Sequence, residues 1–366
     1  MPTVKDICKL IEKLAPIAYQ ESYDNAGLLV GNQDMEISGI LLTLDITEEV
    51  IDEAITKNAN MIVAHHPIIF KGLKRLTGSN YIERSVIKAI QNNIALYASH
   101  TNLDSVKGGV NTKICEKLGL QNIQMLSSSK GSLVKLTTFT PASHISEVSK
   151  ALFSAGCGHI GNYDKCSFNT EGTGTFRPLE KANPFVGKQK ELHKEKEIRT
   201  ETILPTHLQN QVIRALKKAH PYEEVAYDIY PIENENPDVG IGCIGELPEA
   251  MNVLDFMQNL KKTFNLKVIR HTEFCSKTIK KVAVCGGSGS FLLQNAIRAN
   301  ADIFITGDFK YHEFFDAEKQ IIIADIGHYE SEHCSLEIFN ELITENFANF
   351  ATYFTNVDTN PINYFL

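Results

Sequence analysis

Apolar positions in the first third of the chain alternate between a helical and a strand-like spacing. The spacing over residues 4–14 predicts an amphipathic helix, and the apolar run over residues 40–44 predicts a buried strand. Both patterns then repeat, which predicts helices over residues 48–57, 82–91 and 110–118 and strands over residues 61–64 and 94–98. This alternation is typical of an α/β fold with mostly parallel sheets covered by helices.

The same alternation returns after about residue 240. Strands are predicted over residues 281–285, 303–306 and 321–324, and helices over residues 253–264, 291–299 and a long stretch from His328. The two outer thirds of the chain are therefore expected to form one core, and the pattern would allow them to share one sheet.

The middle of the chain differs in composition from the two outer thirds. It runs from a serine run at residues 127–129, through the glycine-rich residues 172–174 and a polar run at residues 187–200, to an acidic stretch with prolines at residues 231–237. Such boundaries predict an inserted domain over residues 127–238, between the two halves of a discontinuous core, residues 1–126 and 239–366.

Composition excludes several classes of protein. A net charge of -8 and a pI near 5.9 make nucleic-acid binding unfavourable, since that binding depends on neutralising phosphates. No apolar run approaches the roughly 20 residues that cross a bilayer. The first helical stretch carries Lys5, Asp6, Lys9, Glu12 and Lys13, so we expect no signal peptide. The eight cysteines form no CxxC pair, so we expect reduced thiols and a cytoplasmic location.

Two adjacent histidines stand where a predicted strand ends. His65 and His66 follow the strand at residues 61–64, and Pro67 closes it. Ligands bind at this carboxyl edge in open α/β sheets, and successive strand residues point to different sides, so the pair can face two different metal ions. The alternative is a pair of hydrogen-bonded structural histidines.

A carboxylate follows the next predicted strand. Asp104 lies just past residues 94–98 and should reach the same edge, although an N-cap or turn role is the alternative for it. His100 is a weaker candidate, better explained as a residue that orients a ligand or supports the structure.

His328 and Glu332 open the last long predicted helix. Their i, i+4 spacing places both side chains on one face, whereas Glu330 points elsewhere. His333 and Glu337 have the same spacing on another face, and periodicity alone does not exclude them. An ordinary exposed charged face is the alternative for such a pair.

Together these residues provide three imidazoles and two carboxylates, enough to hold two ions with positions left open. Mixed nitrogen and oxygen ligands suit Zn, Mn or Fe better than Mg or Ca, and the absence of thiolates favours a catalytic site over a structural one. The predicted ligands are His65, His66, Asp104, His328 and Glu332.

Six motifs in the outer thirds resemble the GTP cyclohydrolase 1 type 2 homologue family, also called Nif-three-like. They are residues 24–28 (DNAGL), Leu44-Asp45, His65-His66-Pro67, residues 100–104 (HTNLD), Thr306-Gly307-Asp308 with Tyr311-His312, and residues 327–332 (GHYESE). The resemblance implies an α/β sandwich with a dinuclear metal centre in a toroidal homohexamer, and the donor types make Zn the expected metal, with Mn or Fe as alternatives. It implies that Glu332 touches both ions, with His66 and Asp104 on one and His65 and His328 on the other.

Longer bacterial members of that family carry an inserted domain similar to the ferredoxin-like fold of PII and CutA. Residues 172–178 (GTGTFRP) and 220–224 (HPYEE) look like the signatures of this longer class. For residues 220–224, packing or a hairpin explains the sequence without any chemistry.

Two further segments remain open to alternative interpretations. The run at residues 285–290 (CGGSGS) is predicted to join a strand to a helix, where it either cradles a phosphate or makes a tight turn. Asp308, Tyr311 and His312 follow another strand and could line the same cleft. His312 would then shuttle a proton, although such residues more often orient metal ligands.

The leading hypothesis is a metal-dependent hydrolase of a nucleotide or related small molecule, in which metal-activated water attacks carbon or phosphorus. Opening of a guanine ring and phosphoester hydrolysis are two such reactions. Asp45, Asp308 and His312 are the candidate general acids or bases. The alternative is a non-catalytic regulatory or metal-handling hexamer in which the inserted domain senses a small ligand.

Overall fold

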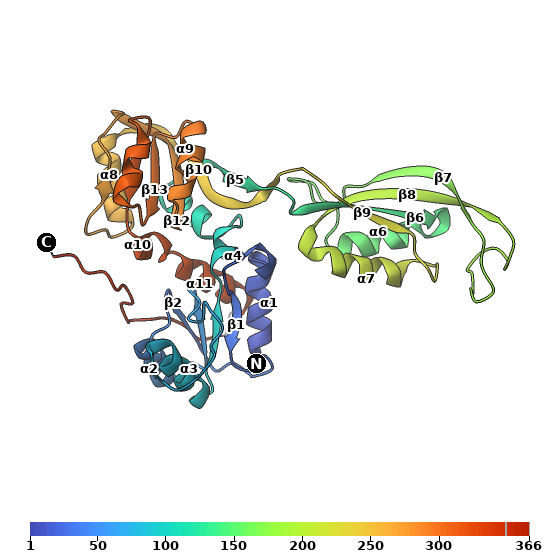
Figure 1. The fold of residues 1–366 in the computed structure, drawn as a ribbon, viewed down its shortest axis with the longest axis horizontal. Helices are drawn as coiled ribbons and strands as arrows, with labels where there is room; N and C mark the ends of the chain where they lie inside the picture. The colour runs from blue at the N-terminus through green and yellow to red at the C-terminus, as the bar shows by residue number, and fades with distance from the viewer. Residues whose placement is uncertain (348–349, 366) are drawn as a thin grey trace. The chain divides into compact units, whose positions relative to one another are not determined.

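The computed structural model describes residues 1–347 and 350–365 and divides the chain into two compact units (Figure 1). The first unit combines Met1–Ser128 with Asp238–Leu366, and the second is Ser129–Pro237. Both units mix helices with strands, and the strands form three sheets. The protein therefore has a mixed α/β fold with several sheets.

The first sheet of unit 1 has the order β1-β4-β3-β2-β15 and is parallel except at the β1 edge. Successive residues of its central strands face two different cores, because side chains alternate along a strand. One core lies under α2 and α3, and the other under α1, α5 and α11. The strands are β1 (Gly27–Val30), β2 (Ile40–Thr43), β3 (Met61–Ala64), β4 (Ala95–Ala98) and β15 (Thr352–Phe354), and the helices are α1 (Val4–Leu14), α2 (Glu48–Thr56), α3 (Tyr81–Gln91), α5 (Val110–Lys117) and α11 (Ser335–Asn346).

The second sheet of unit 1 has the order β11-β14-β13-β12-β10-β5, with β12, β13 and β14 parallel. Its faces are covered by α8 and by α9. The elements are β5 (Gln121–Ser129), β10 (Asn236–Asn252), β11 (Arg270–His271), β12 (Thr278–Ser288), β13 (Ile303–Gly307), β14 (Ile322–Asp325), α8 (Val253–Thr263) and α9 (Leu293–Arg298).

The outer thirds of the chain form two sheets rather than one, and each sheet contains a strand from the other third: β15 joins the first sheet and β5 joins the second. Antiparallel strands stand at the edges of both parallel sets: β1 pairs with β4, β11 with β14, and β10 with β12. The two sheets remain separate and are joined through the core that α1, α5 and α11 share with both of them. The short β15 pairs with β2 in parallel.

The long helix expected from His328 is interrupted. It consists of α10 (His328–Glu332) and α11, which begins at Ser335. Ser331 Oγ donates to the carbonyl oxygen of His328 at 2.8 Å, and such side-chain bonds to the helix backbone bend helices.

Unit 2 has the element order β-α-β-β-α-β and an antiparallel sheet of order β7-β8-β6-β9. Helices α6 and α7 pack on it through Leu136, Val148, Leu152, Leu204 and Leu216. The elements are β6 (Leu133–Pro141), α6 (Ile145–Ser154), β7 (Phe168–Phe176), β8 (His193–Pro205), α7 (Gln209–Ala219) and β9 (Tyr227–Pro231). In neither unit is any described helix both long and apolar enough to cross a bilayer.

Candidate metal centre

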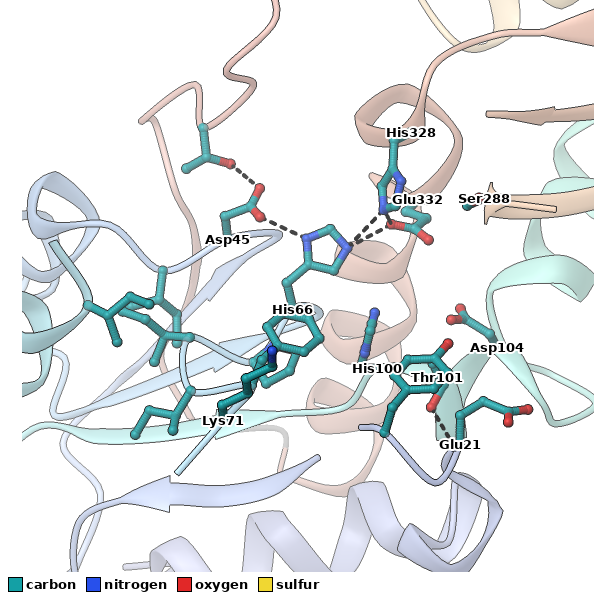
Figure 2. A pocket seen from close by; sticks show the side chains of 18 of the residues that line it. Glu21, Asp45, His66, Lys71, His100, Thr101, Asp104, Ser288, His328 and Glu332 are labelled. Atoms are coloured by element: carbon teal, nitrogen blue, oxygen red, sulfur yellow. Dashed lines mark hydrogen bonds and ion pairs between the residues drawn. The ribbon is translucent and has the colours of Figure 1, made fainter. Parts of the chain in front are cut away.

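Side chains from both sheets of unit 1 meet in one cavity (Figure 2). His65 and His66 follow directly on β3, and Asp104 ends α4 (Thr101–Asp104), a short helix that begins shortly after β4. His328 and Glu332 lie on α10, which follows β14. The structure thus brings together all five residues that the sequence singled out as ligands.

Glu332 is the centre of this arrangement. Its Oε2 atom lies 2.8 Å from His66 Nε2, 3.0 Å from His328 Nε2 and 3.7 Å from His65 Nε2. His65 Nε2 in turn lies 3.6 Å from Asp104 Oδ1. Donor atoms therefore gather in two groups that share Glu332, each close enough to hold a metal ion: His65 with Asp104, and His66 with His328.

This grouping differs from the pairing that the resemblance implied. The fully buried His65 ring approaches Asp104, whereas the partly exposed His66 ring approaches His328, with 3.4 Å between their Nε2 atoms. Because the two rings follow one another at the end of the strand, they point to different sides. His65 therefore meets Asp104, and His66 meets His328.

One part of the site lacks internal hydrogen bonds. His65 Nδ1–H donates to the carbonyl oxygen of Ser99 at 2.9 Å, which leaves the lone pair on Nε2. His65 Nε2 and Asp104 Oδ1 are both buried and have no hydrogen-bond partner. Acceptor atoms facing one another without a donor are costly in a protein interior. A divalent cation bound between them would satisfy both atoms, so these residues fit a metal ion.

Glycine residues make room for the shared carboxylate. Gly287 has a φ of +63°, and a Cβ there would lie only 2.1 Å from Glu332 Oε1. The N–H groups of Gly286 and Gly287 donate to Asn111 Oδ1 at 2.8 Å and to Ser331 Oγ at 3.0 Å. Since both N–H groups already have partners, this segment does not offer them to a phosphate, and through Ser288 it is part of β12.

Two aspartates hold the imidazoles in place. His66 Nδ1–H donates to Asp45 Oδ1, and His328 Nδ1–H donates to Asp308 Oδ2, both at 2.7 Å. A hydrogen bond on the far nitrogen fixes the orientation of a ligand histidine and raises its basicity. Asp45, in turn, accepts a hydrogen bond from Thr359 Oγ1 at 3.0 Å. The sequence singled out Asp45 and Asp308 as acids or bases, and the structure places them behind the ligands.

The surroundings shift the protonation of these groups in opposite directions. Burial lowers the pKa of His65 to about 4. Burial opposes protonation of His66 and His328 too, but their hydrogen bonds to carboxylates outweigh it and raise the pKa to about 10 for His66 and about 9 for His328. Burial and the neighbouring Glu332 raise the pKa of Asp104, whereas the surrounding imidazoles overcome burial and lower the pKa of Glu332.

His100 occupies the cavity wall beside the donors. Its Nδ1–H donates to Asp24 Oδ1 at 2.8 Å, and its ring centroid lies 5.3 Å from that of His66. Asp24 also accepts a hydrogen bond from the backbone N–H of Thr101 at 3.1 Å and one from the Thr101 hydroxyl. His100 can approach His65 and His66 closely enough to share an ion with them.

Other histidines and acids considered from the sequence lie outside the cavity lining. His312 is exposed and contacts the rings of Tyr311 and Phe315. Glu337 pairs with Lys117 at 2.6 Å, and Glu330 accepts a hydrogen bond from Asn360 at 3.2 Å. Helical spacing alone had set Glu330 apart from the donors but had not excluded Glu337.

The cavity has a volume of about 1480 Å³. Residues 69–79, a segment after β3 that the sequence did not single out, are here named the basic loop, and residues 69–75 of it line the cavity. The sequence did contain a sign of this segment, since an aromatic residue and three basic residues closely follow the histidine pair: Phe70, Lys71, Lys74 and Arg75.

Comparison with known proteins places these features in a family. The family described as Duf34/NIF3 (NGG1p interacting factor 3) matches residues 2–361. A protein of Halalkalibacterium halodurans named GTP cyclohydrolase 1 type 2 homolog is 43% identical over 324 residues, which cover 88% of this chain and 87% of that protein. A Bacillus subtilis protein of the same name is 37% identical over 370 residues, 98% of each chain.

Solved structures show the same architecture. A Bacillus cereus protein related to NIF3 superposes with a TM-score of 0.86 at 38% identity, over 100% of this chain and 99% of that one. The Staphylococcus aureus protein SA1388 superposes with a TM-score of 0.78 at 29% identity, again over 100% and 99%.

Proposed function

This chain belongs to the Duf34/NIF3 family, and on that premise we propose that it is a dinuclear metal-dependent hydrolase of a nucleotide or a related small molecule. The proposed ligands are His65, His66, Asp104, His328 and Glu332, with Glu332 shared between two ions. The nitrogen and oxygen donor set favours Zn, with Mn or Fe as alternatives.

The observation that carries this proposal is the buried contact between His65 Nε2 and Asp104 Oδ1. Neither atom has a hydrogen-bond partner, and Glu332 Oε2 lies 3.7 Å from the same imidazole nitrogen. An apolar or fully hydrogen-bonded arrangement would cost less in a site with no ligand. The arrangement is explained when a cation is bound between these atoms.

Bound divalent ions would supply Lewis acidity and would stabilise negative charge that develops on the substrate. Side chains of the protein would orient the ligands, exclude water and transfer protons. Asp45 and Asp308 hold two imidazoles by their far nitrogens, and burial of His65 and Glu332 excludes water from the floor of the cavity. We assign proton transfer to His100, because it lies on the cavity wall and Asp24 orients its ring.

The relatives' name, GTP cyclohydrolase 1 type 2 homolog, motivates hydrolytic opening of a guanine ring as the first reaction to test. We also propose that unit 2 is a ferredoxin-like domain, because its β-α-β-β-α-β order with antiparallel pairing is that of this fold. The toroidal homohexamer and the cytoplasmic location implied by the sequence are further proposals. Eight free cysteines support the second of them.

Elemental analysis of protein purified without added metal tests the centre directly. We expect about two ions per chain, and loss of both in Glu332→Gln, because both donor groups contain that carboxylate. Asp104→Asn should lose one ion. The matched control is Glu330→Gln, two residues away on α10 and outside both groups, which should keep the wild-type content.

Turnover is then measured on metal-loaded protein with a panel of purine nucleotides. Hydrolysis that disappears in Glu332→Gln and persists in Glu330→Gln supports the enzyme. Full metal content with no hydrolysis of any nucleotide would favour the regulatory or metal-handling alternative.

A further inference from the structure

The basic loop places three cations on the wall of the cavity that holds the donors. Lys71, Lys74 and Arg75 are exposed side chains, and all three line this cavity (Figure 2 shows Lys71). Among residues 1–347 and 350–365, none of them has an ion-pair partner. Most of the other lysines near the surface of the first sheet behave differently, as Lys88 does with Asp52 at 2.6 Å.

The loop is anchored at both ends, so its cations are held beside the cavity. At its start, Asn25 Nδ2 donates to the carbonyl oxygen of Ile69 at 2.6 Å. At its end, Glu83 accepts from the backbone N–H groups of Thr77 and Ser79 at 2.8 and 3.1 Å. Hydrogen bonds from both hydroxyl groups of these residues complete the anchor. Only the middle of the loop, which carries the cations, is without such bonds.

Aromatic rings accompany the cations. Phe70 is 46% exposed and lies edge-to-face against His100, with 5.5 Å between ring centroids. Tyr81 and Phe291 line the same cavity and are 57% and 63% exposed. Exposed aromatic faces beside a concave site are typical of surfaces that bind a ligand, because planar rings stack on them.

We propose that the basic loop binds the phosphate groups of a substrate with a planar ring, and that Phe70 contacts the ring. The inference rests on the proposed function, since it specifies the substrate class of the same centre. Lysine and arginine bind phosphate through charge-assisted hydrogen bonds. Asp45 and Glu83 also line the cavity, but both carboxylates already accept hydrogen bonds from the chain, whereas the three cations of the basic loop have no such partners within the described part of the chain. Metal ions bound by Asp104 and Glu332 would offset the negative charge of those two side chains.

Equilibrium binding to metal-loaded full-length protein tests this assignment, with GTP, inorganic pyrophosphate and guanosine as probes. The triple variant Lys71→Ala, Lys74→Ala, Arg75→Ala should weaken GTP and pyrophosphate binding by roughly tenfold or more, because each phosphate loses charged partners. Guanosine binding should change little in this variant. Phe70→Leu should show the opposite pattern, weakening GTP and guanosine but not pyrophosphate.

The matched control removes three positive charges from another part of unit 1. Lys261, Lys262 and Lys267 are exposed and lie outside the cavity lining, so their triple alanine variant should bind all three probes like the wild type. Equal loss of affinity in both triple variants would show a general charge effect and overturn the proposal. So would wild-type binding of GTP by the basic-loop variant, or no saturable binding of GTP and pyrophosphate to the wild type.

Metal content separates this inference from the proposed function. A basic-loop variant that keeps its ions but loses pyrophosphate affinity supports the phosphate site. Wild-type protein that takes up no metal contradicts the metal centre itself, whatever the basic loop binds.

Discussion

Replacement of Gly287 by alanine should empty the metal centre without unfolding the protein. The added Cβ would lie 2.1 Å from Glu332 Oε1, whereas real Cβ contacts are essentially never below 3.0 Å. The carboxylate must therefore retreat by about 1 Å, and metal-ligand distances tolerate only about 0.2 Å. Since Glu332 belongs to both donor groups, we expect both ions to be lost together.

The cost to the fold itself is small. A φ of +63° disfavours alanine by roughly 1–2 kcal/mol, which a domain of ordinary stability survives. Gly119→Ala is the matched control, because Gly119 has a φ of +71° but a Cβ there meets nothing within 4 Å. The two variants thus share the backbone strain, and only one of them displaces a ligand.

Thermal unfolding with and without zinc, together with elemental analysis, measures the difference. At a free metal concentration about 100 times the Kd, each bound ion stabilises a folded protein by about 2.7 kcal/mol. Wild type and Gly119→Ala should show this gain, and Gly287→Ala should not. Wild-type metal content in Gly287→Ala would refute the argument that glycine is needed to seat the carboxylate.

Further predictions concern two residues behind the centre and the anchor of the basic loop. Asp308→Asn should weaken zinc affinity about 10- to 100-fold in chelator competition, because His328 loses the charged partner of its Nδ1–H group. Unchanged affinity would contradict the orienting role of Asp308. Thr359→Val should weaken it only several-fold, since one hydrogen bond to Asp45, worth about 1 kcal/mol, is lost; a loss as large as that of Asp308→Asn would be unexpected. Glu83→Gln should accelerate tryptic cleavage within the basic loop at neutral pH, and equal cleavage rates would argue against the anchor. Hydrogen bonds from Thr77 and Ser79 lower the pKa of Glu83 to about 2, below the usual value of about 4.3. Its stabilisation of the basic loop is therefore complete above about pH 4.3 and is lost as the pH falls toward 2, which amide hydrogen exchange in the wild type would report.

The sequence predicted those helices and strands whose formation depends on the spacing of apolar residues within the element itself. The helix α1 and the strand β3 have the bounds expected from apolar spacing, since one is amphipathic and the other is a short, fully apolar run. The five donors were found for the same reason: each pair or single residue stands at a strand end or on one helical turn. Spacing along the chain is enough to recognise such positions.

Features that depend on distant contacts could not be predicted in this way. The break after α10 involves Ser331, whose hydroxyl also accepts from Gly287, a residue on another strand. The partition into two sheets depends on which edges pair, and no periodicity encodes that choice. The sequence also placed His312 near the cleft because it closely follows Asp308, but its ring packs on Tyr311 instead.

The hydrogen bond from Thr359 to Asp45 has a consequence for biosynthesis. Synthesis runs from the N-terminus, so His65 and His66 emerge long before the helical turn that supplies Glu332, and Thr359 follows later still. A nascent or prematurely terminated chain therefore exposes two imidazoles without the carboxylate that they share. Under the proposed function, a chain that stops before Glu332 lacks the carboxylate common to both donor groups and should hold neither ion.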